Sequence, residues 1–146
     1  MPLYIINKEI RIFYSDSNIK KEIVKINGIK KPQSPFNHVV KAGKFLFLSS
    51  QLSIDLKTDK ILSGNITEQT RQALENIKFL LESSGATMDD ILKVVVYMRD
   101  VKDFDQMNRI YRKYFLEGQE PARVTIQALS PIKDIDIEIE VIALLP

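Results

Sequence analysis

Residues 121–146 read PARVTIQALSPIKDIDIEIEVIALLP, and this stretch decides the fold that the rest of the chain completes. Both of its halves alternate apolar with polar residues, which is typical of strands that bury one face. Arg123 stands in the first half, and three carboxylates alternate with isoleucines and a valine in the second, at Asp136, Glu138 and Glu140. The pattern predicts two antiparallel strands joined by a turn near residues 130–133.

Antiparallel pairing of such a hairpin predicts that Arg123, Thr125 and Gln127 share one face with the three carboxylates. Two interpretations of this polar face are open. In the first, it meets solvent and Arg123 makes a surface salt bridge that contributes little. In the second, it is a site where Arg123 binds a carboxylate ligand through two hydrogen bonds and a glutamate handles a proton. Alternation alone does not choose between them.

The upstream residues supply further strand patterns. Phe36–Val40 and Lys44–Leu52 flank a tight turn, and Ile91–Met98 is a dense β-branched run typical of a buried strand. Two prolines predict a loop rather than a helix or central strand at Lys31–Pro35. Weaker strand patterns precede these, with one turn among them, at Tyr4–Ile6, Ile10–Tyr14, Ser15–Asn18 (the turn) and Lys20–Ile26, the last an edge strand.

Two helices are predicted between the strands. Asn65 and Glu68 have the spacing of a capping box, and Gly85 fits the left-handed position that ends a helix. Asp103 and Gln106 predict the start of the second helix, of the D-x-x-Q type, and the apolar stripe of this helix contains Phe104, Met107, Tyr111, Tyr114 and Phe115. The element order predicts an α+β fold, with two helices on one face of a mixed or mostly antiparallel sheet. The other face then needs water, a partner or another subunit.

Composition excludes several classes of function. The 146 residues carry a net charge of +2 and no cysteine, which excludes disulfides, thiolate metal sites and a thiol nucleophile. His38 is the only histidine, and the sequence has no glycine-rich phosphate loop and no apolar run of the roughly 18 residues that span a membrane. We therefore expect a cytoplasmic protein without metal, membrane or nucleic acid as a partner.

Four stretches, in order along the chain, resemble the RidA/YjgF family of reactive-intermediate deaminases, which is also labelled endoribonuclease L-PSP. They are LSSQLSIDLKTDKI, QTRQALENIKFLLESSGATMDDILKVVVYMRDVKDF, MNRIYRKYF, and PARVTI with the following IEIEVIA. The resemblance covers residues 20–146. It predicts a single domain at residues 19–146, after an N-terminal extension of unknown role at residues 1–18.

The resemblance implies a chorismate-mutase-like fold and a homotrimer with a barrel-like centre and clefts between subunits. It also implies hydrolysis of 2-imino and enamino acids, of the 2-aminoacrylate, 2-iminopropanoate and 2-iminobutanoate type, to 2-keto acids and ammonia. No cofactor or metal is expected for this reaction. The chain is thus expected to be an enzyme whose partner is a small 2-imino or 2-keto acid.

The site residues follow from the same resemblance. Arg123 matches the arginine that binds the substrate carboxylate, and Glu138 matches the acid that positions the attacking water and moves protons. Ser49 and Asn108 match substrate-binding positions of the family, and Thr125 matches a cleft position that is often cysteine in relatives.

Two further cleft positions, Phe36 and Ser50, depart from the family pattern. Phe36 replaces a tyrosine whose hydroxyl enters the site, and Ser50 replaces a glycine. Two alternatives stay open: the loss of the tyrosine hydroxyl favours a trimer that binds a small carboxylate without turnover, and the endoribonuclease label of some relatives favours an RNA-directed protein. The second has little support, because the basic residues form only a modest cluster, at Lys20, Lys21, Lys25, Lys30 and Lys31.

Overall fold

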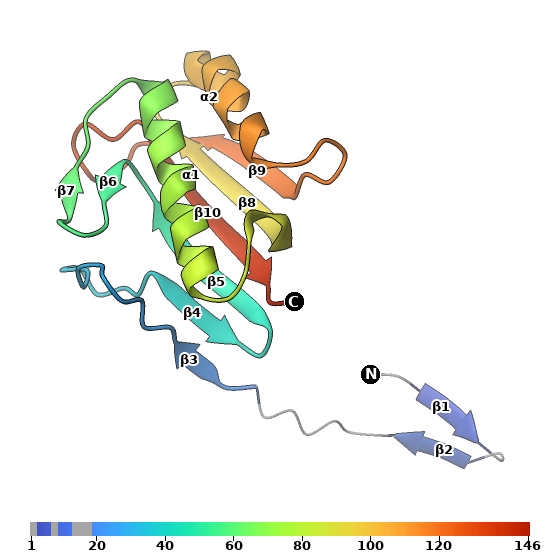
Figure 1. Ribbon diagram of the computed structural model, residues 1–146. Coiled ribbons are helices and arrows are strands. Elements are labelled where there is room, and N and C mark those ends of the chain that lie inside the picture. The colour runs from blue at the N-terminus through green and yellow to red at the C-terminus, as the bar shows by residue number, and fades with distance from the viewer. Residues whose placement is uncertain (1–2, 7–8, 13–18) are drawn as a thin grey trace.

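The computed structural model describes residues 3–6, 9–12 and 19–146 (Figure 1). Six strands form one mixed sheet in the order β3-β4-β5-β10-β8-β9. They are β3 (Lys21–Ile23), β4 (Val39–Ala42), β5 (Phe45–Gln51), β8 (Ile91–Met98), β9 (Ala122–Gln127) and β10 (Ile137–Leu144). Two small sheets contain the remaining strands, β1 (Leu3–Ile6) with β2 (Glu9–Ile12) and β6 (Ile54–Asp55) with β7 (Lys60–Ile61).

Both helices, α1 (Ile66–Ser83) and α2 (Phe104–Tyr111), cover the same face of the large sheet (Figure 1). The core lies between this face and α1, because every second residue of β10 is buried against the helix layer. Helices on one face of a mixed sheet confirm the predicted α+β fold. Among the described residues, no helix combines the length and apolar character that crossing a bilayer requires.

The ends of α1 form as the sequence predicts. The Asn65 side chain accepts a hydrogen bond from the Glu68 backbone N–H, and the Glu68 carboxylate accepts one from the Asn65 N–H, at 3.1 and 2.8 Å. Gly85 follows the helix with a φ of +88°, which costs a glycine little. The second helix also starts where the sequence predicts, because Asp103 is the N-cap residue of α2, although its side chain makes no capping hydrogen bond.

The predicted terminal hairpin is wrong. Strand β10 lies between β5 and β8 and is antiparallel to both, whereas β9 lies at the sheet edge, parallel to β8. The unit β8–α2–β9 is a crossover, which the intervening helix makes possible for parallel strands. Residues 128–136 therefore pass over the end of β8 instead of closing a tight turn between neighbours.

The predicted common face for Arg123 and the carboxylates is also wrong. The strand register aligns Arg123 with Val94 and Val141, which are buried beneath the helices, and aligns Glu138 with Tyr97 on the opposite face. The physical reason is that β8 lies between β9 and β10. The register with the neighbouring strand determines which alternate side chains of a strand point towards the helices, and β9 is paired with β8 instead of with β10. Arg123 and Glu138 of one chain therefore lie on opposite sides of the sheet.

The face without helices carries an exposed apolar surface, which we call the open face. Phe45, Phe47, Val124 and Ile126 lie on it, each about 40% exposed. Thus the alternate row of β9 that points to the open face is apolar, and its polar row points towards α2. The prediction of a face that is not covered within one chain is confirmed.

The weaker strand predictions have mixed outcomes. Strand β3 is an edge strand and shorter than predicted, and residues 31–35 contain neither helix nor strand, as expected. Strands β1 and β2 confirm the patterns at Tyr4–Ile6 and Ile10–Tyr14 as far as Ile12. The remainder of the second pattern and the turn predicted at Ser15–Asn18 lie outside the described residues.

Candidate functional site

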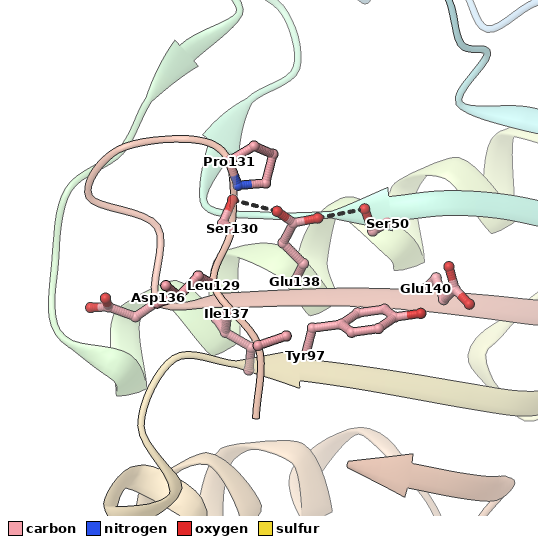
Figure 2. A pocket seen from close by; sticks show the side chains of 10 residues that line it. Ser50, Tyr97, Leu129, Ser130, Pro131, Asp136, Ile137, Glu138 and Glu140 are labelled. Atoms are coloured by element: carbon pink, nitrogen blue, oxygen red, sulfur yellow. Dashed lines mark hydrogen bonds between the residues drawn. The ribbon is translucent and has the colours of Figure 1, made fainter. Parts of the chain in front are cut away.

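A carboxylate held by two serine hydroxyls lies on the open face (Figure 2). Ser50 donates to Glu138 Oε2 at 2.7 Å, and Ser130 donates to Glu138 Oε1 at 2.5 Å. The three side chains line a cavity of about 280 Å³, together with Tyr97 and Glu140. We call this region the Glu138 cleft. The residues of this cleft come from four separate parts of the chain, namely β5, β8, β10 and the loop before β10.

Ser50 reaches Glu138 because β5 contains a β-bulge. Gln51 is paired with Ile139 and Leu48 with Val141, so that Ser49 and Ser50 together stand opposite the single residue Glu140. An extra residue of this kind changes the direction in which its side chains point. Ser50 does not have a positive φ, so the serine that replaces the family's glycine fits this backbone.

The loop that carries Ser130 is fixed at its far end by Gln69 of α1. The buried Gln69 amide accepts from the Asp136 N–H at 2.8 Å and donates to the Asp134 carbonyl at 3.1 Å. Arg99 adds an ion pair with Asp136 at 3.0 Å and a hydrogen bond to the Ile135 carbonyl. These partners explain the orientation of the Asp136 side chain, which points away from Glu138 in Figure 2.

Tyr97 forms the wall of the cleft next to Glu140. Burial, and then the neighbouring Glu140 and Glu138 carboxylates, raise the pKa of the Tyr97 phenol. The phenol is therefore protonated at neutral pH and offers one hydrogen-bond donor at this wall.

Arg123 lies on the other side of the sheet, in a region that we call the Arg123 corner. Its Nη1 donates to Asn108 Oδ1 of α2 at 2.8 Å. Its guanidinium carbon lies 4.6 Å from the ring centroid of Tyr111 and 5.9 Å from that of Phe104, which are cation–π distances. An amide and two aromatic rings therefore fix the guanidinium at the edge of the sheet.

Two buried hydroxyls flank this corner without a hydrogen-bond partner among the described residues, those of Tyr111 and Thr125. Burial raises the pKa of Tyr111 to about 12, although the Arg123 guanidinium acts in the opposite direction. The phenol thus stays protonated beside a permanent positive charge. A guanidinium with further hydroxyls nearby is suited to a carboxylate, which it can bind through two parallel hydrogen bonds.

A second cavity, of about 360 Å³, adjoins the Glu138 cleft at Ser50. Phe36 lines it and packs edge to face on His38, with ring centroids 5.5 Å apart. Burial lowers the pKa of His38. Ser49 does not line either cavity, because its hydroxyl donates to the Asn37 carbonyl at 2.7 Å.

Apart from Ser49, the structure thus divides the predicted site residues into two groups. Glu138, Ser50 and Phe36 lie around the two adjoining cavities, and Arg123 and Asn108 are in contact at the corner, with Thr125 on the same strand face. No cluster of metal-ligating side chains occurs in the described part of the chain.

Sequence reasoning does not predict that Ser130 contacts Glu138 or that Tyr111 contacts Arg123. The pattern places Ser130 only in a turn, and Tyr111 only in the core stripe of its helix. The helix between β8 and β9 is the signal that could have found both. It favours a parallel crossover, which places the tyrosine over β9 and carries the loop back across the sheet.

The sheet order, the one-sided helix layer, the Glu138 cleft and the Arg123 corner define a class of small α+β proteins. The chain belongs to the RidA/YjgF family, because the family model described as Endoribonuclease L-PSP matches residues 27–145. Among curated relatives, a RutC family protein of Pyrococcus horikoshii is 46% identical over 123 residues, which cover 84% of this chain and 97% of the relative. The chloroplastic Reactive Intermediate Deaminase A of Arabidopsis thaliana is 36% identical, over 90% of this chain and 70% of the relative.

Solved structures have the same fold. A putative endoribonuclease from Thermotoga maritima superimposes with a TM-score of 0.78 at 32% identity, over 86% of this chain and 98% of that one. The crystal structure of E. coli TdcF with bound serine superimposes with a TM-score of 0.76 at 30% identity, over 86% and 99%. These neighbours confirm the family fold for this chain.

Proposed function

We propose that the protein is a cytoplasmic homotrimer that hydrolyses reactive 2-imino and enamino acids to 2-keto acids and ammonia. Each site would contain Arg123 from one subunit and Glu138 from the next. The observation that carries this proposal is the location of the two residues on opposite faces of one sheet. One substrate can contact both groups only if different copies of the chain supply them.

The open face supports assembly through a second copy. Its apolar side chains Phe47, Val124 and Ile126 are each about 40% exposed in the single chain. Burying apolar surface between subunits contributes roughly 25 cal/mol per Å² before the costs of association. A cyclic trimer repeats one such contact three times and creates equivalent clefts.

Two relatives support the chemistry. One curated relative is named a reactive intermediate deaminase, and one structural neighbour is described with bound serine. Serine carries an α-carboxylate, as 2-imino acids do. For this chain we infer that the same kind of carboxylate binds to the Arg123 guanidinium, whose planar fork matches its geometry.

In the proposed reaction Glu138 accepts a hydrogen bond from a water molecule and directs it at the imine carbon. The water oxygen forms a bond to this carbon while Glu138 accepts one water proton and passes it to the nitrogen, which gives an amino alcohol. The carbon–nitrogen bond then breaks as Glu138 transfers the second water proton to the leaving nitrogen, so that ammonia leaves, the carbonyl of the 2-keto acid forms and Glu138 is again ionised. The balance is one imine and one water consumed for one keto acid and one ammonia.

The test is the release of keto acid and ammonia from 2-aminoacrylate, generated by a dehydratase in the same vessel. We expect acceleration by the wild-type protein and a loss on the order of 100-fold in kcat/KM for Arg123→Ala, because a charged partner of the substrate is removed. Arg112→Ala is the matched control, since Arg112 is an exposed arginine next to α2. Equal rates with and without the wild-type protein would contradict the proposal. Keto-acid binding in calorimetry without hydrolysis would replace it with a binding function.

A further inference from the structure

We propose that Ser50 and Ser130 act as a two-serine clamp that positions the Glu138 carboxylate for the attack by water. The inference rests on the proposed function and adds two positioning residues to it. Neither serine needs to touch the substrate in this role. Each would act through Glu138, by holding one of its two oxygens.

The first support is the geometry of the carboxylate. Each oxygen of Glu138 accepts one hydroxyl hydrogen bond, from Ser50 at 2.7 Å and from Ser130 at 2.5 Å. The two donors reach it from different elements (Figure 2), so that rotation of the carboxylate would break at least one bond. An ionised carboxylate has about four acceptor positions, which leaves about two for a water molecule in the cleft.

The second support is the direction of the Ser130 hydroxyl. Its oxygen accepts a hydrogen bond from the Ile132 N–H at 3.1 Å. This contact occupies one acceptor position of the hydroxyl and leaves its proton free to point at Glu138. The far end of the same loop is held by the buried Gln69, which is bonded to Asp134 and Asp136. The donor is thus fixed in both position and orientation.

The third support is the origin of Ser50. The β-bulge in β5 turns this hydroxyl towards Glu138, and the backbone at Ser50 does not require a glycine. A glycine at this position would leave Glu138 Oε2 without its hydroxyl donor. The serine at position 50 therefore supplies a function that glycine does not have.

The clamp predicts an effect on the chemical step rather than on substrate binding. A glutamate side chain has three rotatable bonds, and a misplacement of about 1 Å can cost on the order of 100-fold in rate. We expect Ser130→Val to lower kcat by about 10-fold and to leave KM within about twofold. The double variant with Ser50→Gly is expected to lose about 100-fold in kcat.

Matched variants separate the hydroxyl from side-chain size. Ser130→Thr and Ser130→Val add nearly the same volume, but only threonine keeps the donor. We expect the threonine variant to stay within about threefold of the wild-type kcat. Ser84→Ala is the distant control, because the Ser84 hydroxyl is also hydrogen-bonded, to Leu80 at the end of α1.

Two outcomes separate the clamp from the proposed function. If the wild type hydrolyses the imine but the threonine and valine variants have equal kcat, the clamp is wrong and the function stands. If the wild type does not hydrolyse any imine, crystal structures of the wild type and of the double variant still test whether the two serines position Glu138. The clamp predicts one Glu138 conformer in the wild type and a displaced carboxylate in the double variant, and an unchanged carboxylate would overturn it.

Discussion

The Glu138 cleft and the Arg123 corner differ in how they hold their charged group. In the cleft, two hydroxyls from distant parts of the chain fix a carboxylate on an open sheet face. In the corner, an amide and two aromatic rings fix a guanidinium under a helix. The side chains of each region contact one another within one chain, yet neither region holds both the proposed carboxylate-binding group and the proposed proton acceptor.

This difference shows what a second subunit would add. A carboxylate substrate bound to Arg123 needs a proton acceptor on its other side, and Glu138 faces away from its own Arg123. In the proposed assembly, each charged group already has its partners within one chain, so that joining two subunits does not require either region to be rearranged. Preformed halves lower the ordering cost when the site is completed.

The largest effect is expected when the two halves are separated. Ile126→Glu places a charge in the apolar surface of the open face, where the isoleucine is 44% exposed. We expect monomers in light scattering and a loss of at least about 100-fold in activity, because each site depends on assembly. Phe79→Glu is the control, since Phe79 is similarly exposed on the helix side. If the Ile126→Glu variant formed a fully active trimer, the open face would not be part of the subunit interface.

The next largest effect is expected in the cleft itself. Glu138→Gln keeps the size of the side chain but removes its ability to accept a proton. We expect kcat to fall by roughly 100- to 10,000-fold with little change in KM, which is the range for loss of a general base. Rate measurements over a range of substrate concentrations test this. A change in KM alone would assign Glu138 to binding instead.

A smaller effect is expected at the aromatic platform of the corner. Tyr111→Leu removes the ring 4.6 Å from the Arg123 guanidinium, and Tyr111→Phe keeps it. A desolvated cation–π contact contributes about 2 kcal/mol, so we expect KM to rise by up to about 30-fold for leucine and by less than about threefold for phenylalanine. If both variants behave alike, the hydroxyl matters more than the ring.

The smallest effect concerns pH, and it distinguishes Tyr111 in the Arg123 corner from His38 in the cavity next to the Glu138 cleft. With the pKa of Tyr111 at about 12, this phenol does not titrate near neutral pH, whereas burial lowers the pKa of His38 below 6.5. As the pH falls below about 6.5, the folded state binds fewer protons than the unfolded state does. The contribution of His38 to stability is therefore present above about pH 6.5 and is lost as the pH falls. Relative to His38→Gln, the wild-type Tm should drop more between about pH 7.5 and about pH 5. Parallel Tm curves would contradict this.

Much of the fold could be predicted because local physics fixes it. The capping box at Asn65, the positive φ at Gly85 and the buried run of β8 are short-range features that tertiary structure did not override. The position of β10 in the sheet could not be predicted in this way, because strand order depends on pairing between distant segments.

The sequence supplied candidate site residues, but it did not supply their arrangement in the fold. Resemblance supplied Arg123 and Glu138, and alternation correctly separated polar from apolar rows on each strand. When β8 lies between β9 and β10, alternation does not determine whether the polar residues of β9 and of β10 lie on the same face of the sheet. Ser130 escaped prediction because its partner is eight residues away across a loop with no regular period.

The central claim is that Arg123 and Glu138 act from different subunits, and mixed trimers test it most directly. Arg123→Ala and Glu138→Gln proteins, each inactive alone, are unfolded together in equal amounts and refolded. Random assembly into cyclic trimers should give about one quarter of the sites an intact arginine and an intact glutamate. If the sites are shared between subunits, the mixture should recover about one quarter of the wild-type activity. If both residues acted from one chain, every site would carry a defect and the mixture would stay inactive.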